Sequence, residues 1–130
     1  MSEVLILGEV KEGSLDPKSL ELLGAGQKLA SELNGEVSLL LMGSSVEKAA
    51  DEALSHGPAK VYKMEHPLLE GFKPDLWVAA LTQACRKIGP KVFLMGHSFV
   101  GMEVAPRLSA RLNSRLTTDC IDLAIDPEDG

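Results

Sequence analysis

The sequence predicts an α/β domain with three layers, in which helices cover both faces of a mainly parallel sheet. Five short apolar runs rich in valine, isoleucine and leucine alternate with four segments of helical spacing. The runs are continuously apolar, as expected of parallel strands that are covered on both faces. A chain of 130 residues has the ordinary size of one domain, which we assign to residues 1–126.

The predicted strands can be ordered from the connections between them. Right-handed crossovers restrict the topology, and we predict the order 3-2-1-4-5, numbering the strands along the chain. The first and fourth strands then lie side by side at the switch point, where such sheets bind ligands. The third strand is short, which favours a position near a sheet edge. The five strands cover residues 4–10, 37–42, 61–64, 92–95 and 118–125.

Local end signals bound the first two predicted helices. Asp16 is an N-cap residue followed by Pro17 in the first helical position, and Asn34–Gly35 ends the same helix. Ser44 and Glu47 have the spacing of a capping box for the second helix. The apolar stripe of that helix consists of Val46, Ala49, Ala50, Ala53 and Leu54.

The third predicted helix spans residues 75–88 and the fourth spans residues 103–112. Basic residues occupy the last turn of the third helix and Gly89–Pro90 follows it, in agreement with the helix dipole and the usual stop signals. Trp77 is expected in the core or half-buried. Pro106 falls in the first turn of the fourth helix, where a missing N–H costs little.

Composition excludes several classes of protein. The net charge of −6 argues against general nucleic-acid binding, because neutralising phosphates requires a basic surface. No apolar run reaches the roughly 18 residues of a membrane span. The N-terminus enters a strand at once and has no signal or transit pattern, so we expect a cytoplasmic protein.

Cys85 and Cys120 are far apart in apolar surroundings, which favours buried reduced thiols over a disulfide. The histidines and cysteines lack short ligand spacing, so we expect no metal site.

The switch point brings two predicted loops together. Residues 9–14 follow the first strand, and residues 96–101 follow the fourth. The second loop contains a serine between glycines and leads into a helix. The residues that we expect to form this ligand crevice or interface are Glu9, Gly96, His97, Ser98, Gly101, Arg107 and Asp119.

Two catalytic interpretations of residues 96–101 disagree with the spacing. A hydrolase elbow is G-x-S-x-G, but this loop is G-x-S-x-x-G and no histidine follows Ser98. A P-loop needs lysine and a hydroxyl after its second glycine, where Met102 and Glu103 stand. Backbone amides at this helix start can hold an anion weakly, although Glu103 and Glu9 oppose it. We favour glycines that simply permit a tight turn, with Ser98 contacting backbone or capping a helix.

Two further patterns have structural interpretations. The glycines of Gly24–Gly26 lie inside the first helix, where small residues allow close packing on the sheet, so they are not a dinucleotide fingerprint. Arg107, Arg111 and Arg115 recur every four residues. This stripe is interpreted as a solvated face or, alternatively, as an interface with an acidic partner or another domain.

Three segments of the chain resemble the N-terminal domain of the alpha subunit of electron transfer flavoprotein. They are VLILGEVKEGSLDPKSLELLGAGQKLA, GEVSLLLMG and VFLMGHSFVGMEVAPRLSARLNSRLTTDCIDLAI, of which the third is the most specific. The family has a strand, a small-residue loop with a glycine, a Pro-Arg pair in a helix and an aspartate before the last strand. Here these are Gly101, Pro106–Arg107 and Asp119, and the resemblance covers essentially the whole chain.

The resemblance implies an adenine-nucleotide-binding-like fold and a role in assembly. In the family this domain embraces the beta subunit and the flavin domain of a heterodimer. FAD is held mainly by a second, C-terminal domain of the alpha subunit, and AMP, where present, belongs to the beta subunit. None of the flavin-binding motif residues falls on this chain. Residues 127–130 are then a tail or the start of a linker to an FAD-binding domain, in a fragment or, alternatively, in a stand-alone relative.

We therefore expect an electron carrier domain without catalytic, cofactor-binding or metal-binding residues of its own. The implied partners are the beta subunit and, through the complex, dehydrogenases; no nucleic acid or membrane is expected. One alternative is a stand-alone small nucleotide-binding protein resembling universal stress proteins, although the phosphate-binding G-x-x-G and its distant Gly-Ser are missing. A serine hydrolase, motivated by Ser98 alone, is the other.

Overall fold

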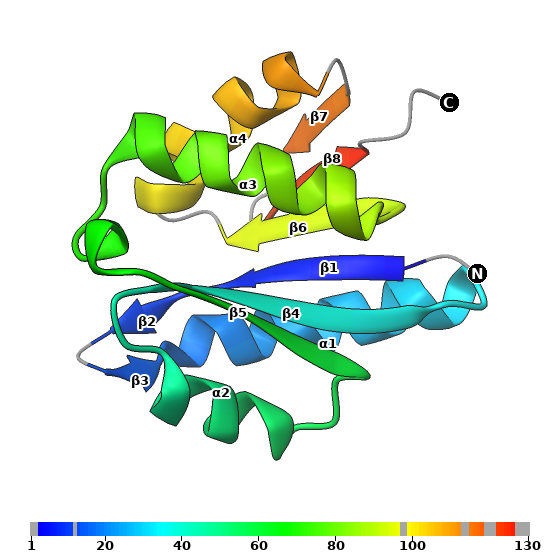
Figure 1. Ribbon diagram of the computed structural model, residues 1–130. Coiled ribbons are helices and arrows are strands. Elements are labelled where there is room, and N and C mark those ends of the chain that lie inside the picture. Colours follow the sequence, from blue (N-terminus) through cyan, green and yellow to red (C-terminus); the bar gives the residue numbers. More distant parts are fainter. Residues whose placement is uncertain (1–2, 12, 97–98, 113–114, 119–121, 127–130) are drawn as a thin grey trace.

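A six-stranded sheet forms the middle layer of the protein (Figure 1). The computed structural model describes residues 3–11, 13–96, 99–112, 115–118 and 122–126. The order of the strands in the sheet is β5-β4-β1-β6-β8-β7. Their bounds are β1 (Glu3–Gly8), β4 (Glu36–Gly43), β5 (Lys60–Glu65), β6 (Val92–Gly96), β7 (Arg115–Thr118) and β8 (Asp122–Asp126).

The predicted fold class and strand order are confirmed. The five predicted strands correspond, in the order 3-2-1-4-5, to β5, β4, β1, β6 and β8. The first four of these are mutually parallel. Strand β5 ends the sheet, as its short apolar run indicated. Strands β1 and β6 are neighbours, so the switch point lies between them.

The prediction of one strand over residues 118–125 is wrong. Two antiparallel strands, β7 and β8, occupy this region, and β8 runs antiparallel to β6. Strand β7 is the added element: it lies at the edge of the sheet and runs in the same direction as β6, because both pair antiparallel with β8. In β7, Arg115 and Thr117 alternate with Leu116, a pattern typical of an edge strand rather than of a buried parallel strand.

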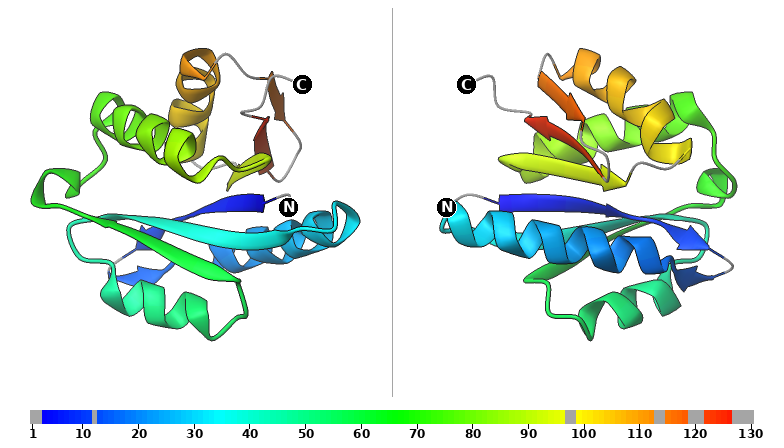
Figure 2. Two further views of the ribbon diagram at one scale, coloured as in Figure 1. Left: turned by 45° about the vertical axis from the view of Figure 1, so that its right-hand side comes forward. Right: turned by 180° about the vertical axis from the view of Figure 1, so that it is seen from behind.

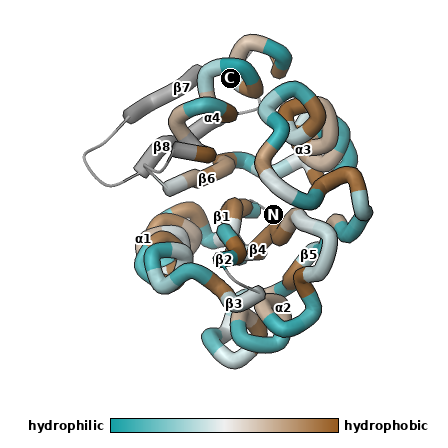
Figure 3. The backbone as a smooth tube through the Cα atoms, turned by 90° about the vertical axis from the view of Figure 1, so that its left-hand side faces the viewer, coloured by the Kyte–Doolittle hydropathy of each residue, from teal (hydrophilic) through white to brown (hydrophobic). Residues whose placement is uncertain are grey.

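Helices cover both faces of the sheet (Figures 1 and 2). Figure 3 shows the layers along the strand direction, with hydrophobic residues gathered around β1, β4 and β6. The first two helices, α1 and α2, lie on one face, and α3 and α4 lie on the other. Their bounds are α1 (Pro17–Glu32), α2 (Glu47–Leu54), α3 (Pro74–Ile88) and α4 (Phe99–Arg111), with a short 3-10 turn η1 (Pro67–Leu69) before α3.

Alternating side chains of the same strands fill two separate cores. In β1, Leu5 and Leu7 face α3 and α4, whereas Val4 and Ile6 face α1 and α2. Successive side chains of a strand point to opposite faces, so a continuous apolar run supplies both cores. Phe93 of β6 lies at the centre of the α3–α4 core and is fully buried.

The end signals of α1 and α3 are confirmed. The Asp16 carboxylate accepts a hydrogen bond of 3.0 Å from the backbone N–H of Lys18, and Pro17 opens α1. Asn34 takes the left-handed conformation after the helix, with φ of 55°. Gly89 does the same after α3, with φ of 66°, and its N–H donates to the carbonyl of Cys85.

The predicted start of α2 is wrong in its capping residue. The N-cap position is Val46, and no side chain of the helix itself caps it. Instead, the Glu65 carboxylate at the end of β5 accepts a 3.0 Å hydrogen bond from the backbone N–H of Val46. Four members of the predicted stripe are buried, but Leu54 is 55% exposed because α2 ends there, beyond the sheet.

The predicted start of α4 is also wrong. The helix begins at Phe99, four residues earlier than predicted, so Pro106 lies in its interior and not in its first turn. Val104 and Leu108 are fully buried, and Val100 packs against the same core at the same helical spacing. Burial of this stripe outweighs the single backbone hydrogen bond that the exposed proline cannot donate.

The first predicted strand extends over less of the chain than expected. Strand β1 ends at Gly8, and a two-stranded ribbon follows it, made of β2 (Val10–Lys11) and β3 (Ser14–Leu15). Gly13 has φ of 82° in the turn of this ribbon, which is a conformation that favours glycine.

None of the helices in the described part of the chain is long and apolar enough to cross a membrane.

Cys85 provides a pH test of the α3–α4 core. Burial raises the pKa of its thiol from the ordinary 9.0 to about 12. From about pH 9 to about pH 12 the unfolded chain loses a proton that the native chain keeps. We therefore expect the free energy of unfolding to fall as pH rises, by at most about 1.4 kcal/mol per pH unit from this group.

The effect of Cys85 can be isolated by difference. Urea unfolding is measured across this pH range for Cys120→Ser and for Cys120→Ser combined with Cys85→Ala. Other titrating groups contribute equally to both proteins, so the difference between their stabilities reports Cys85. Parallel pH profiles would contradict the prediction.

Candidate functional site

The switch-point crevice lies at the carboxyl ends of β1 and β6. Glu9 directly follows β1, and Gly96 is the last residue of β6. A Cβ atom placed on Gly96 would lie 3.5 Å from Oε2 of Glu9, so the glutamate side chain lies against the glycine. The structure thus places Glu9 beside Gly96, and their role as a ligand crevice or interface stays a prediction.

The backbone of Glu9 is fixed by the start of α1. Its N–H donates a hydrogen bond of 2.9 Å to Oγ of Ser19, and its carbonyl accepts a bond of 2.8 Å from the N–H of Asp16. Ser19 is buried in the first turn of the helix, where its hydroxyl has little contact with water. The hydroxyl therefore needs a hydrogen-bond partner within the protein, and the Glu9 N–H is one. The β2–β3 ribbon therefore leaves the sheet at a fixed angle. Sequence spacing gave no sign of this contact between residues ten apart.

The other predicted crevice residues are distributed differently. Gly101 lies in the first turn of α4. Arg107 lies further along the same helix, and its Nη1 is 3.8 Å from Oδ1 of Asp75 at the start of α3. Both of these side chains are exposed, so the pair adds little to stability. The structure thus places Arg107 toward α3, not beside Glu9. His97, Ser98 and Asp119 fall outside the described residues.

The predicted arginine stripe begins on α4 and continues beyond its end, as expected. Arg111 is the last residue of α4, whereas Arg115 begins β7. Arg107 and Arg111 are both exposed on α4, in agreement with the interpretation as a solvated face.

Charge limits what the described part of the crevice can bind. The nearest described acidic group to the Gly96 backbone is the Glu9 carboxylate, which repels phosphate and carboxylate groups. No described group of three or more histidine, cysteine, aspartate or glutamate side chains could hold a metal ion. The Glu9 carboxylate therefore disfavours a phosphate group beside Gly96.

The sequence pattern assigned no functional role to Trp77. It packs half-buried against the α3–α4 core, as expected, and its ring meets Phe72 edge to face at a centroid distance of 5.3 Å. Its Nε1 is buried without a hydrogen-bond partner among the described residues. The edge-to-face pair fixes the loop before α3 against the helix.

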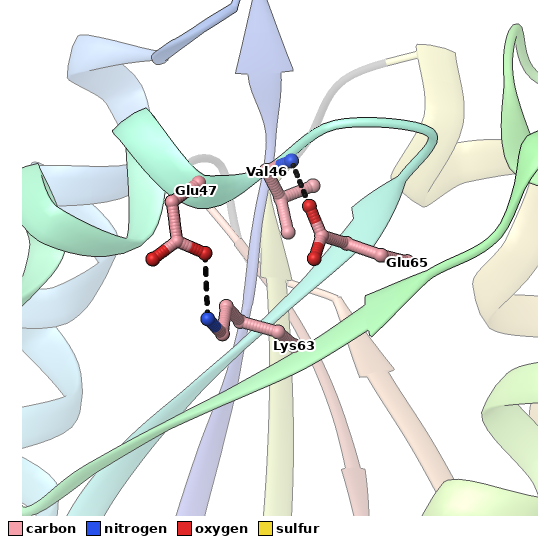
Figure 4. A network of polar contacts seen from close by, with 4 residues as sticks. All are labelled: Val46, Glu47, Lys63 and Glu65. Carbon is pink, nitrogen blue, oxygen red and sulfur yellow. Dashed lines mark hydrogen bonds and ion pairs between the residues drawn. The ribbon is translucent and has the colours of Figure 1, made fainter.

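Two polar contacts tie β5 to the start of α2 (Figure 4). Glu65 accepts the Val46 N–H, and Nζ of Lys63 lies 2.7 Å from Oε2 of Glu47. The Glu47 carboxylate raises the pKa of the Lys63 ammonium group through this hydrogen bond and its charge. Both side chains of the ion pair are exposed, whereas the bond from Val46 is partly buried.

Removing the Glu65 carboxylate is expected to weaken the start of α2. Glu65→Ala leaves the Val46 N–H without its acceptor, which costs about 1 kcal/mol in the free energy of unfolding. Urea unfolding measures the loss. Glu70→Ala, which removes another exposed glutamate from the same region, is the control and should change stability by less than half as much. Equal losses in the two variants would contradict the capping role.

Comparisons with known proteins find one group of proteins that are similar to this chain in sequence. A family model described as "Electron transfer flavoprotein domain" matches residues 4–129. Electron transfer flavoprotein subunit alpha of Clostridium acetobutylicum is 36% identical over 125 residues, which are 96% of this chain and 37% of the relative. Acryloyl-CoA reductase electron transfer subunit beta of Anaerotignum propionicum is 34% identical, over 95% of this chain and 34% of its own length.

A third relative belongs to another electron-transfer complex. Lactate dehydrogenase (NAD(+),ferredoxin) subunit LctC of Acetobacterium woodii is 36% identical over 109 residues, which are 84% of this chain and 26% of that subunit. The matched part is thus 26% to 37% of the length of these three relatives, so the chain spans well under half of each.

Proposed function

This chain belongs to the electron transfer flavoprotein domain family, and we propose that it serves as the N-terminal scaffold domain of an alpha subunit. Its relatives are subunits named for electron transfer, and they carry the proposal because nearly the whole chain aligns with a part of each of them. In this role the domain supports assembly with a beta subunit. Dehydrogenases are reached through that complex, which belongs in this proposal to the cytoplasm.

FAD belongs, in this proposal, to a part of the alpha subunit outside the 130 residues, and AMP to the beta subunit. The charge of the described crevice supports this division, since the Glu9 carboxylate lies against Gly96 where a diphosphate would need positive charge. When bound elsewhere in the complex, the flavin supplies the electron chemistry. This domain contributes packing and orientation.

Flavin content tests the proposal directly. The purified 130-residue chain is expected to be colourless, whereas a full-length alpha subunit co-purified with its beta subunit is expected to be yellow. A visible flavin spectrum at one flavin per chain from the 130 residues would overturn the scaffold role.

The nucleotide-binding alternative is tested separately, and the relatives do not favour it. Calorimetric titration with AMP and with ATP is expected to give no binding heat. Saturable binding of either nucleotide at one site per chain would favour the alternative over the scaffold.

A further inference from the structure

Two adjoining cavities form a groove between β5 and α3. The larger, of about 640 Å³, has Leu40 and Tyr62 on the sheet side and Ala84 and Ile88 on the helix side. The smaller, of about 440 Å³, continues along Leu69, Leu76 and Ala80 toward η1. Met64 and Lys63 line both cavities, so they join into one groove along β5. We call this feature the β5 groove.

The groove runs beside an open strand edge. Strand β5 pairs only with β4 in the described sheet, through a parallel register in which Tyr62 lies opposite Leu40 and Met64 opposite Met42. Peptide groups of alternate residues face opposite sides of a strand. The N–H of His66 donates to the carbonyl of Gly43 in β4, at 3.1 Å. The peptide groups of Met64 and Tyr62, two and four residues earlier, therefore face β4 as well, and those of Val61, Lys63 and Glu65 face the open side.

The length of the groove favours a chain over a small molecule. Six residues of β5 extend for about 20 Å. Tyr62 and Met64 are half-buried on the groove side, and Leu68, at its η1 end, is 60% exposed. An added strand would place every second side chain over this apolar surface and hydrogen-bond to the open edge at the same time.

Basic side chains at the other end of the groove favour an occupant that carries a negative charge there. Lys60 and Lys87 line the rim of the larger cavity, and neither forms an ion pair in the part of the chain that the structure describes. One acidic group, Glu3, lines the same cavity and accepts hydrogen bonds from Ser38 (2.6 Å) and Tyr62 (3.4 Å). With two lysines and one glutamate, these three side chains carry one net positive charge. The net charge of the chain is −6, so this basic rim contrasts with the protein as a whole.

Lys63 and Glu65 do not reverse this balance. Both are engaged with the start of α2, on the other face of the sheet, through Glu47 and Val46 respectively (Figure 4). Lys60, which has no ion pair among the described residues, is an edge-strand charge of the kind that discourages two like edges from pairing. The arrangement therefore disfavours a second copy of this chain as the occupant.

We propose that the β5 groove binds an extended segment of another polypeptide, which adds to β5 as a further strand. Its alternate side chains are apolar and cover Tyr62 and Met64, and an acidic side chain at one end meets Lys60 and Lys87. This site is separate from the Glu9–Gly96 crevice and does not depend on the proposed scaffold function.

The test uses the 130-residue chain and an octapeptide with blocked ends. From its first to its eighth position the peptide reads Glu-Thr-Val-Thr-Val-Thr-Val-Thr. Amide hydrogen exchange is followed by NMR with and without the peptide. We expect slower exchange at Val61, Lys63 and Glu65, because their N–H groups gain acceptors. Exchange at Tyr62 and Met64 should hardly change, because these groups already face β4.

Charge-reversal variants test the specificity of the groove. Lys60→Glu combined with Lys87→Glu should weaken binding of the glutamate peptide about tenfold and strengthen binding of a peptide with lysine in its place. Lys28→Glu combined with Lys48→Glu changes net charge equally on exposed positions of α1 and α2, and should leave the affinity near that of the unmodified chain.

Three results would overturn the proposal. The first is unchanged exchange at the three open-edge amides under saturating peptide. The second is equal affinity for the glutamate and lysine peptides. The third is protection of the same amides that rises with protein concentration in the absence of peptide, because a second copy would then occupy the edge.

Discussion

Replacing Phe93 by alanine is expected to lower the free energy of unfolding by about 4 kcal/mol. Phe93 belongs to β6 and has the largest fully buried side chain among the described residues. The side chain lies between the sheet and the helices α3 and α4. Alanine removes most of the ring and leaves a cavity that strands paired on both sides cannot close. A loss of this size is a large part of the stability of an ordinary domain.

Equilibrium unfolding in urea measures the effect of Phe93→Ala through the shift of the midpoint. Phe72→Ala is the matched control, because this second phenylalanine is half-buried before α3 and contacts Trp77 edge to face. Its loss should cost less than half as much. A loss below about 1.5 kcal/mol for Phe93→Ala would contradict the assignment of this residue to the centre of the core.

Two glycines of α1 are expected to respond very differently to the same substitution. A Cβ on Gly26 would lie 2.5 Å from Cδ1 of Ile6 and 3.1 Å from Cγ2 of Val37, both of which belong to packed core residues. Gly26→Val should therefore cost about 3 kcal/mol through overpacking. Gly24 is exposed, and a Cβ there meets nothing within 4 Å. Gly24→Val should leave stability within about 0.5 kcal/mol of the original protein.

This pair tests how α1 packs on the sheet. Thermal and urea unfolding of the two variants are compared under the same conditions, and circular dichroism checks that helix content is kept. If both variants lost similar stability, helix propensity rather than close packing against β1 and β4 would explain the glycines. If neither did, the close approach at Gly26 would be contradicted.

The sequence was informative where a short segment determines its own structure. Asp16 and Pro17 predicted the start of α1 because the capping group and the capped N–H are two residues apart. Continuous apolar runs predicted the parallel strands, and right-handed crossovers then predicted that β1 and β6 would be neighbours. The contact between Glu9 and Gly96 follows from that topology.

The errors arose where partners are distant in the chain or where two rules compete. The cap of α2 comes from Glu65, nineteen residues beyond Val46, so a local capping-box pattern was chosen instead. Pro106 suggested a first turn, but the buried stripe that includes Val104 and Leu108 extends the helix four residues toward the N-terminus. Strand β7 was missed because its apolar and polar residues alternate, unlike the buried strands.

Co-sedimentation with a beta subunit of this family tests the central claim most directly. The account predicts that the 130-residue chain associates with the beta subunit at one to one, and that adding FAD to the chain alone produces no bound flavin. Separate sedimentation of the two proteins, together with stoichiometric FAD binding by the chain alone, would contradict it.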